Sequence, residues 1–190
     1  MPEAGAGLYW YTGSAATRGQ ADAAGRFNIS GVVGHLSVVA PGYASQAVRA
    51  ADHPGGTSDL RIILQRLVPL PVGQSVQTTL FPDEPSQHGI DEGLFWDGGY
   101  DCAPCKVFNV HAPDQFTGTI TIVWDGSVPL GAWVGGGYEG VAATAMAAKG
   151  TTRLDLPFTT PRVSTLLVGV PLSEPRPSAP VVLTVSARTH

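Results

Sequence analysis

The sequence is short of charged residues. Charged side chains make up 14% of the 190 residues, and the formal net charge is −4. The eleven lysines and arginines are spread thinly along the chain, so no basic stripe is available to hold a phosphate backbone. We therefore expect no nucleic-acid partner. No apolar run approaches the length that crosses a bilayer, so no membrane span is expected either.

Sequence motifs of the common hydrolases are also missing. The chain contains neither a Gly-x-Ser-x-Gly elbow nor a His-Glu-x-x-His motif. Its five histidines are scattered, and its two cysteines form one neighbouring pair without a second, so a four-ligand zinc site is not expected. These absences predict a protein without catalytic residues and without a resident cofactor.

Glycine and proline are abundant. The 24 glycines and 16 prolines punctuate short apolar stretches, a composition that favours many short strands joined by turns. Alternation of apolar and polar residues indicates where the strands lie. In the first third, the expected strands are 8–11, 17–21, 26–30, 35–40, 45–49 and 60–64. The later ones are 75–80, 106–110, 117–124, 132–134, 141–147, 152–156, 164–170 and 181–187. Residues 142–149 also have helix propensity, which leaves a helix open there.

A motif in the first part points to a family. It reads Ala-Asp-x-x-Gly-Arg-Phe-x-Ile at 21–29, then Leu-Ser-Val-x-Ala-Pro-Gly-Tyr at 36–43, with a late Ile-x-Leu at 62–64. This pattern resembles the carboxypeptidase regulatory-like domain, a small transthyretin-like sandwich found in many exported bacterial proteins. The resemblance covers roughly residues 3–67. The opening strand that normally precedes residues 2–6 is absent, so the resemblance implies a sandwich with one open edge.

The rest of the chain follows a proline-rich stretch. Residues 69–73, Pro-Leu-Pro-Val-Gly, are the expected linker, because paired prolines favour a stiff, extended connection. Beyond it come Gly-Thr-Ile-Thr-Ile-x-Trp-Asp at 118–125 and Val-x-Leu-Thr-Val at 181–185. This part resembles the bacterial pre-peptidase C-terminal domain and related jelly-roll sandwiches, which are non-catalytic parts of secreted proteins. We therefore predict an all-β chain of two tandem antiparallel sandwiches: a transthyretin-like or immunoglobulin-like one at 1–68 and a jelly-roll-like one at 74–190.

Cys102 and Cys105 stand close together in Asp-Cys-Ala-Pro-Cys. Their spacing is that of a thioredoxin-like redox pair, in which a helix N-terminus lowers the pKa of the first thiol. The strand-helix-strand context of such a pair is missing. The preferred interpretation is a local disulfide that pins the loop before the next strand, and a redox enzyme is the alternative left open.

The loop between residues 81 and 101 contains two further groups of candidate site residues. Its carboxylates are of the type that calcium prefers, although no EF-hand spacing is present. The calcium candidates are Asp91, Glu92, Asp97 and Asp101. Aromatic residues lie among its glycines, where exposed rings stack on sugars. The candidates for ligand binding are Phe95, Trp96 and Tyr100. Solvated carboxylates and rings packed in a core are the simpler alternatives.

These features together predict a non-catalytic module, secreted or displayed at the cell surface, that works through its surfaces. An open sandwich edge exposes unpaired N–H and C=O groups, which a strand from a neighbouring chain completes. The expected partners are therefore other protein chains, including copies of itself, joined by β-strand complementation into a surface assembly or filament. A carbohydrate-binding accessory domain, with glycans as partners, is the alternative.

Overall fold

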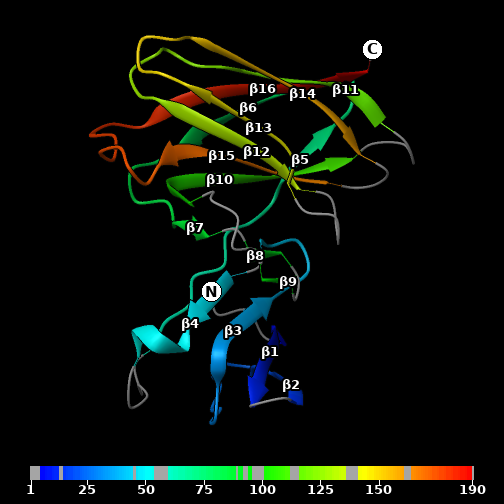
Figure 1. The fold of residues 1–190 in the computed structure, drawn as a ribbon, viewed down its shortest axis with the longest axis vertical. Coiled ribbons are helices and arrows are strands. Elements are labelled where there is room, and N and C mark those ends of the chain that lie inside the picture. Colours follow the sequence, from blue (N-terminus) through cyan, green and yellow to red (C-terminus); the bar gives the residue numbers. More distant parts are fainter. Residues whose placement is uncertain are drawn as a thin grey trace. The chain divides into compact units, whose positions relative to one another are not determined.

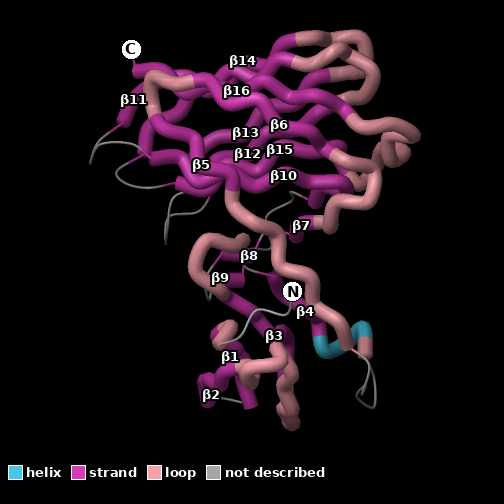
Figure 2. Tube along the Cα trace, turned by 180° about the vertical axis from the view of Figure 1, so that it is seen from behind, coloured by secondary structure: helices cyan, strands magenta, loops and turns pink. Residues whose placement is uncertain are grey.

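The computed structural model shows an all-β protein, as the sequence predicts. It describes residues 5–12, 15–44, 46–53, 60–88, 90–91, 94–95, 101–111, 116–135, 141–160 and 164–189. Strands dominate this part of the chain, and its only helical element is one short 3₁₀ turn (Figure 2). Contacts divide the chain into two compact units. Unit 1 is Met1–Arg66 with Ile90–Phe95, and unit 2 is Leu67–Gly89 with Trp96–His190.

Unit 1 is built on one four-stranded sheet with the order β2-β1-β3-β4. Its elements are β1 (Gly7–Thr12), β2 (Ala15–Gln20), β3 (Val33–Val39), β4 (Gln46–Arg49), the 3₁₀ turn η1 (Ala50–Asp52), β8 (Ile90–Asp91) and β9 (Leu94–Phe95). Neighbouring strands in the four-stranded sheet are antiparallel, and β8 and β9 pair only with each other among the described strands. Within the described part of unit 1, the buried cluster consists of Ala6, Leu8, Ala21, Leu36, Val38 and Ala40.

Local hydrogen bonds hold the turn that carries the first motif. The Asp22 carboxylate accepts from the Ala24 amide at 2.8 Å and from the Arg26 amide at 2.9 Å. The Arg26 Nε also donates to it, at 3.0 Å. Gly25 takes a φ of 70° in this turn, a conformation that glycine adopts without steric cost. The amide of Arg26 is the largest cause that lowers the pKa of Asp22, so this carboxylate stabilises a turn.

Two expected strands of unit 1, 26–30 and 60–64, are wrong. The structure assigns neither segment to a strand or a bridge within the described residues. Their side chains nevertheless alternate between half-buried and exposed. The half-buried ones pack against the unit 1 cluster, and they include Phe27, Ile29, Leu60, Ile62 and Leu64. Alternation reports which side chains face a core, whereas a strand also needs a neighbouring backbone in register.

Unit 2 is a two-layer sandwich (Figure 1). One sheet has the order β13-β12-β15-β10-β5, with β7 also paired to β10, and the other has the order β14-β11-β16-β6. The strands are β5 (Val68–Pro71), β6 (Ser75–Leu80), β7 (Gln87–His88), β10 (Asp101–His111), β11 (Phe116–Val123), β12 (Leu130–Gly135), β13 (Val141–Ala147), β14 (Arg153–Thr160), β15 (Ser164–Pro171) and β16 (Val181–Thr189). All strand pairs are antiparallel except β10 with β5, which is parallel. Of the two possibilities for 142–149, the structure shows the strand, β13.

The core of unit 2 lies between these two sheets. On β16, Val181, Leu183 and Val185 are buried, whereas Val182 between them is exposed. On β11, Ile120 and Ile122 follow the same rule and are fully buried. A period of two along neighbouring strands brings these side chains together on one face. Unit 2 therefore has a closed core, in contrast to the small cluster of unit 1.

The stretch 69–73 differs from the expected linker. Its first three residues belong to β5, where Leu70 is fully buried, and the rest form the turn into β6. The Gly73 amide donates to the Ala187 carbonyl at 2.8 Å, and the Val72 amide donates to the His111 carbonyl at 3.2 Å. This corner therefore ties one sheet to the other. Prolines fit here because β5 is an edge strand, where a missing N–H costs no ladder bond.

Candidate functional site

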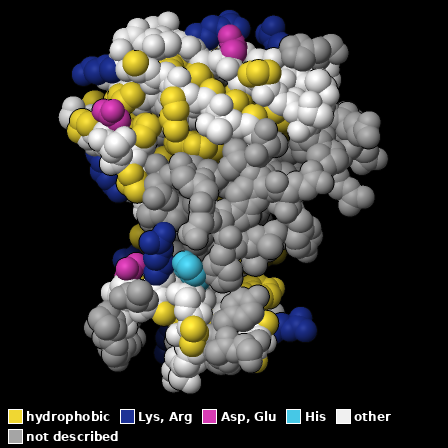
Figure 3. Space-filling view, in the orientation of Figure 1, with side chains coloured by type: hydrophobic (Ala, Val, Ile, Leu, Met, Phe, Trp, Pro, Cys, Tyr) yellow, Lys and Arg dark blue, Asp and Glu magenta, His cyan; other side chains and the backbone are white. Residues whose placement is uncertain are grey.

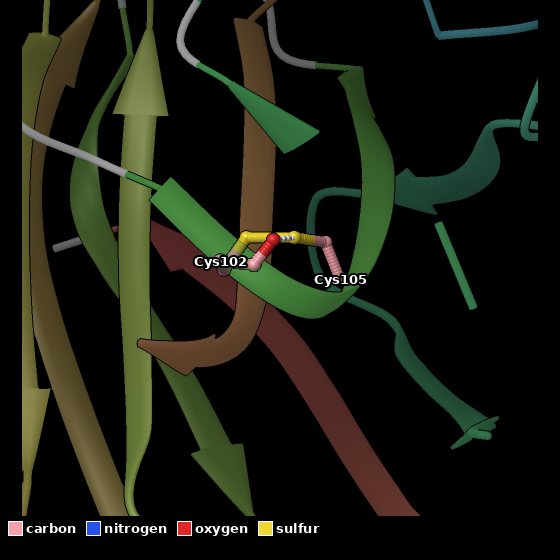
Figure 4. Close-up of a disulfide and its surroundings, with 2 residues drawn as sticks. All are labelled: Cys102 and Cys105. Carbon is pink, nitrogen blue, oxygen red and sulfur yellow. Dashed lines mark hydrogen bonds between the residues drawn. A yellow bond between two sulfur atoms is a disulfide. The ribbon is translucent and has the colours of Figure 1, made fainter. Parts of the chain in front are cut away.

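The cysteine pair lies in a bulge of β10. Cys102 is opposite Pro171 and Cys105 is opposite Gly169, so β10 has two residues where β15 has one. The two sulfurs are 2.16 Å apart, and the disulfide spans this bulge (Figure 4). Both cysteines are completely buried. The pair thus lies at disulfide distance, as the sequence predicts, but within a strand of the sandwich.

Glycine makes room for the disulfide on the neighbouring strand. A Cβ atom on Gly169 would lie 2.4 Å from the Pro104 carbonyl oxygen and 2.9 Å from the Cys102 Cβ. Both distances are shorter than real Cβ contacts, so only glycine fits at this position. Together with Trp133 and the half-buried Leu167, the cysteines form a separate apolar cluster.

The burial of the disulfide bears on the redox alternative. A redox-active pair needs a sulfur that an attacking thiolate reaches and an electropositive setting, such as a helix N-terminus. Cys102 and Cys105 have no exposed surface and belong to a strand. The arrangement is that of a structural crosslink.

The base of the loop after β6 is anchored beside this disulfide. The Cys105 amide donates to the Pro85 carbonyl at 3.3 Å, and β7 pairs with Asp101 and Cys102. The Lys106 ammonium forms an ion pair with the Glu84 carboxylate, and both side chains are largely buried. Polar contacts made away from water hold geometry better than exposed ones. The bulge and the loop base therefore form one connected structure.

Removing the disulfide should cost unit 2 about 2 kcal/mol of unfolding free energy, the loop-closure entropy of a short crosslink. The variant is Cys102→Ala with Cys105→Ala, and urea denaturation without reductant measures the change. Met146→Ala is the control, because this sulfur-bearing side chain is exposed and should change stability by less than about 0.5 kcal/mol. Equal stability of the double variant and the wild type would contradict a stabilising role.

The sequence-predicted ligand residues fall mostly outside the described part of the chain. The backbone of Phe95 and Asp91 is described in β9 and β8, and that of Asp101 at the start of β10, but their side chains are not. Trp96, Tyr100, Glu92 and Asp97 lie outside the described residues altogether. The aromatic platform and the calcium site therefore stay predictions. Among the described residues, no group of three or more His, Cys, Asp or Glu side chains is arranged to hold a metal ion.

Two carboxylates of the described part, Asp125 and Asp155, serve local structure. Hydrogen bonds from the Arg153 side chain, and next from the Thr121 hydroxyl, lower the pKa of Asp155. Those from the Ser127 hydroxyl and amide lower the pKa of Asp125. A general acid needs the opposite, a raised pKa in a shaped cleft. On the face drawn in Figure 3, charged side chains stand apart in small groups among uncharged ones.

Sequence reasoning predicted an open sandwich but missed that two expected strands of unit 1 form no ladder with the residues that the structure describes. Segments 26–30 and 60–64 supply apolar side chains to the sheet, yet neither forms a strand or bridge with described residues. The alternation in their sequence showed where the side chains face but carried no information on pairing. These two segments, together with the edges of the unit 1 sheet, are the candidate interaction site.

Comparison with known proteins leaves the family open. No protein-family model matches the chain, and no curated protein matches it. Among solved structures, the chain is similar to the pre-peptidase C-terminal domain of collagenase from Bacillus anthracis, with a TM-score of 0.42 and 8% sequence identity. The match covers 64% of this chain and 94% of that one. Because this TM-score and identity are too low to carry an argument, the two-layer sandwich of unit 2 is inferred from its own strand order.

No helix in the part of the chain that the structure describes is long and apolar enough to cross a membrane.

Proposed function

We propose that this chain is a non-catalytic extracellular module that joins other protein chains by β-strand addition to unit 1. The observation that carries the proposal is the partial burial of apolar side chains around the core of that unit. Among the described residues, the buried cluster has six members, three of which are alanines. Eight further apolar side chains that pack against this cluster are only partly buried: Trp10, Phe27, Ile29, Val32, Tyr43, Leu60, Ile62 and Leu64.

An added strand would complete this core. Full burial of one Val, Leu, Ile or Phe side chain is worth about 1.5–3 kcal/mol relative to exposure, so several half-buried side chains provide a substantial driving force. Backbone hydrogen bonds of the added strand would supply direction and register.

Two further features suit the proposal. A buried disulfide is typical of proteins that fold in oxidising compartments, which favours a secreted or cell-surface location. The lowered pKa values of Asp22, Asp125 and Asp155 each come from hydrogen bonds within turns and strands. These carboxylates therefore support structure and offer no acid for catalysis.

Calorimetric titration of the whole chain with a synthetic strand peptide tests the proposal. In this peptide, which we call the Glu peptide, Val alternates with Thr, and one central Thr is replaced by Glu. The control is the same peptide with N-methyl groups on alternate amides, which removes N–H donors and keeps every side chain. We expect the Glu peptide to bind and the N-methylated one not to bind. Binding of neither peptide, or equal binding of both, would count against strand addition.

A further inference from the structure

We propose that the incoming strand adds to the free edge of β2 and that it carries an acidic residue facing Arg18. This inference rests on the proposed function and names its site. The unit 1 sheet has two edge strands, β2 and β4. β2 has six residues, whereas β4 has four and runs directly into the 3₁₀ turn η1. The longer edge offers more ladder positions to a partner strand.

The register of β1 and β2 shows which backbone groups point to this free edge. The Ala21 amide donates to the Ala6 carbonyl at 3.0 Å, which makes residues 21 and 6 a hydrogen-bonded pair. The strands stay in register from Gly7 opposite Gln20 to Thr12 opposite Ala15. Hydrogen-bonded and non-bonded pairs alternate along an antiparallel ladder. The N–H and C=O groups of Ala16, Arg18 and Gln20 therefore point away from β1, toward the free edge.

β2 lacks most of the devices that protect an edge strand. It contains no proline, and its register with β1 has no bulge. Within the described residues it pairs with β1 alone. Natural sheets usually block such an edge with proline, bulges or charged side chains. The only charge on β2 is Arg18, which is exposed.

On the core-facing side of the sheet, a partly buried indole ring borders the free edge of β2. Trp10 and Thr17 are opposite each other and so share one face of the sheet. The Trp10 ring reaches over Gly19, because a Cβ on that glycine would lie 3.4 Å from two ring atoms. Its indole Nε1 is buried and has no hydrogen-bond partner among the described residues, an unusual state for a buried donor. An apolar side chain of an added strand would pack against this ring.

The two faces of β2 define the chemistry of the partner. Arg18 is opposite Tyr9, on the face away from Trp10. An added strand thus meets an exposed guanidinium on one face and an indole ring on the other. Opposite charges across neighbouring strands attract, and aromatic rings favour apolar or β-branched neighbours. The partner that fits is an extended peptide with apolar residues at alternate positions and a carboxylate between them.

Amide hydrogen exchange measured by NMR on the whole chain, with and without the Glu peptide, tests the location. In the free chain, the amides of Ala16, Arg18 and Gln20 should exchange fast, and those of Thr17 and Gly19 slowly. The Glu peptide should protect the first three. If the peptide binds but protects β4 or residues 26–30 and 60–64, the β2 site is wrong and strand addition stands. If these three amides are already protected in the free chain, the edge is covered and the inference is wrong.

Two variants at Arg18 test the partner's chemistry. Arg18→Pro removes an N–H that points to the free edge, so the sheet should tolerate it, and the Glu peptide should bind roughly tenfold more weakly or worse. Arg18→Glu keeps that N–H and reverses the charge, so it should prefer a matching peptide with Lys in place of Glu. Circular dichroism verifies that both variants fold. Unchanged affinity in Arg18→Pro, or an unchanged preference in Arg18→Glu, would overturn the inference.

Discussion

Replacing Gly169 with alanine is expected to lower the unfolding free energy of unit 2 by about 3 kcal/mol, the upper part of the range for overpacking a tight core. The added Cβ would lie 2.4 Å from the Pro104 carbonyl oxygen. That oxygen belongs to the backbone of the disulfide-closed bulge, so it cannot move aside as the end of a flexible side chain would. Either β15 separates from β10 or the bulge distorts, and both outcomes disturb the cluster around Trp133.

Gly19→Ala is the matched control for this prediction. Both glycines lie in strands, but a Cβ on Gly19 would meet only the end of the Trp10 ring, at 3.4 Å, an ordinary contact. Alanine at position 19 should raise the unfolding free energy of unit 1 by no more than about 1 kcal/mol, because glycine loses more backbone entropy on folding. Urea denaturation of both variants compares the two positions. Equal losses of unfolding free energy in the two variants would show that the close contact with the Pro104 carbonyl does not exclude a side chain at position 169.

The sequence predicted most strands of unit 2 because their alternation reaches a closed core. β11 and β16 are the clearest cases, since every second residue of each faces the other sheet. The same signal failed in unit 1 at 26–30 and 60–64. There the apolar side chains face a core, but no backbone within the described ranges pairs with these segments in a ladder. A pattern of side chains carries no information about the strand that should lie beside it.

Contacts between distant segments were beyond the reach of sequence reasoning. The spacing of Cys102 and Cys105 was sufficient to predict a local disulfide, but nothing near them in the sequence indicates that Gly169 must face them. The prolines of 69–73 are likewise compatible with two different structures. They suit a stiff linker and an edge strand equally, and only the parallel pairing of β5 with β10 distinguishes the two.

The glycines and the aspartate of the family-like motif in the first part form turns, whereas its apolar residues lie in or against the unit 1 cluster. Asp22 and Gly25 form one turn, and Gly42, with a φ of 81°, lies in another, next to Tyr43. The Arg66 guanidinium lies over the Tyr43 ring, 5.8 Å from the ring centroid, and the backbones of these two residues form an antiparallel β-bridge. The residues that carry the family resemblance therefore determine the local structure of unit 1, whereas the proposed interaction uses the backbone groups at the free edge of β2. A sequence motif that forms turns gives little information about a binding site made of backbone N–H and C=O groups.

Leu183→Ala should lower the unfolding free energy of unit 2 by about 3–5 kcal/mol. Leu183 is on the central strand β16, between β11 and β6, and its side chain has no exposed surface. Truncation there leaves a cavity whose walls come from both sheets, so the site cannot collapse easily. Val182→Ala is the control on the same strand, because Val182 is 50% exposed and its loss should stay below about 1 kcal/mol. Chemical denaturation followed by tryptophan fluorescence measures both, with buried Trp124 and Trp133 reporting on unit 2. A larger loss of unfolding free energy in Val182→Ala than in Leu183→Ala would show that Val182, and not Leu183, faces the core. That result would contradict the two-layer core of unit 2.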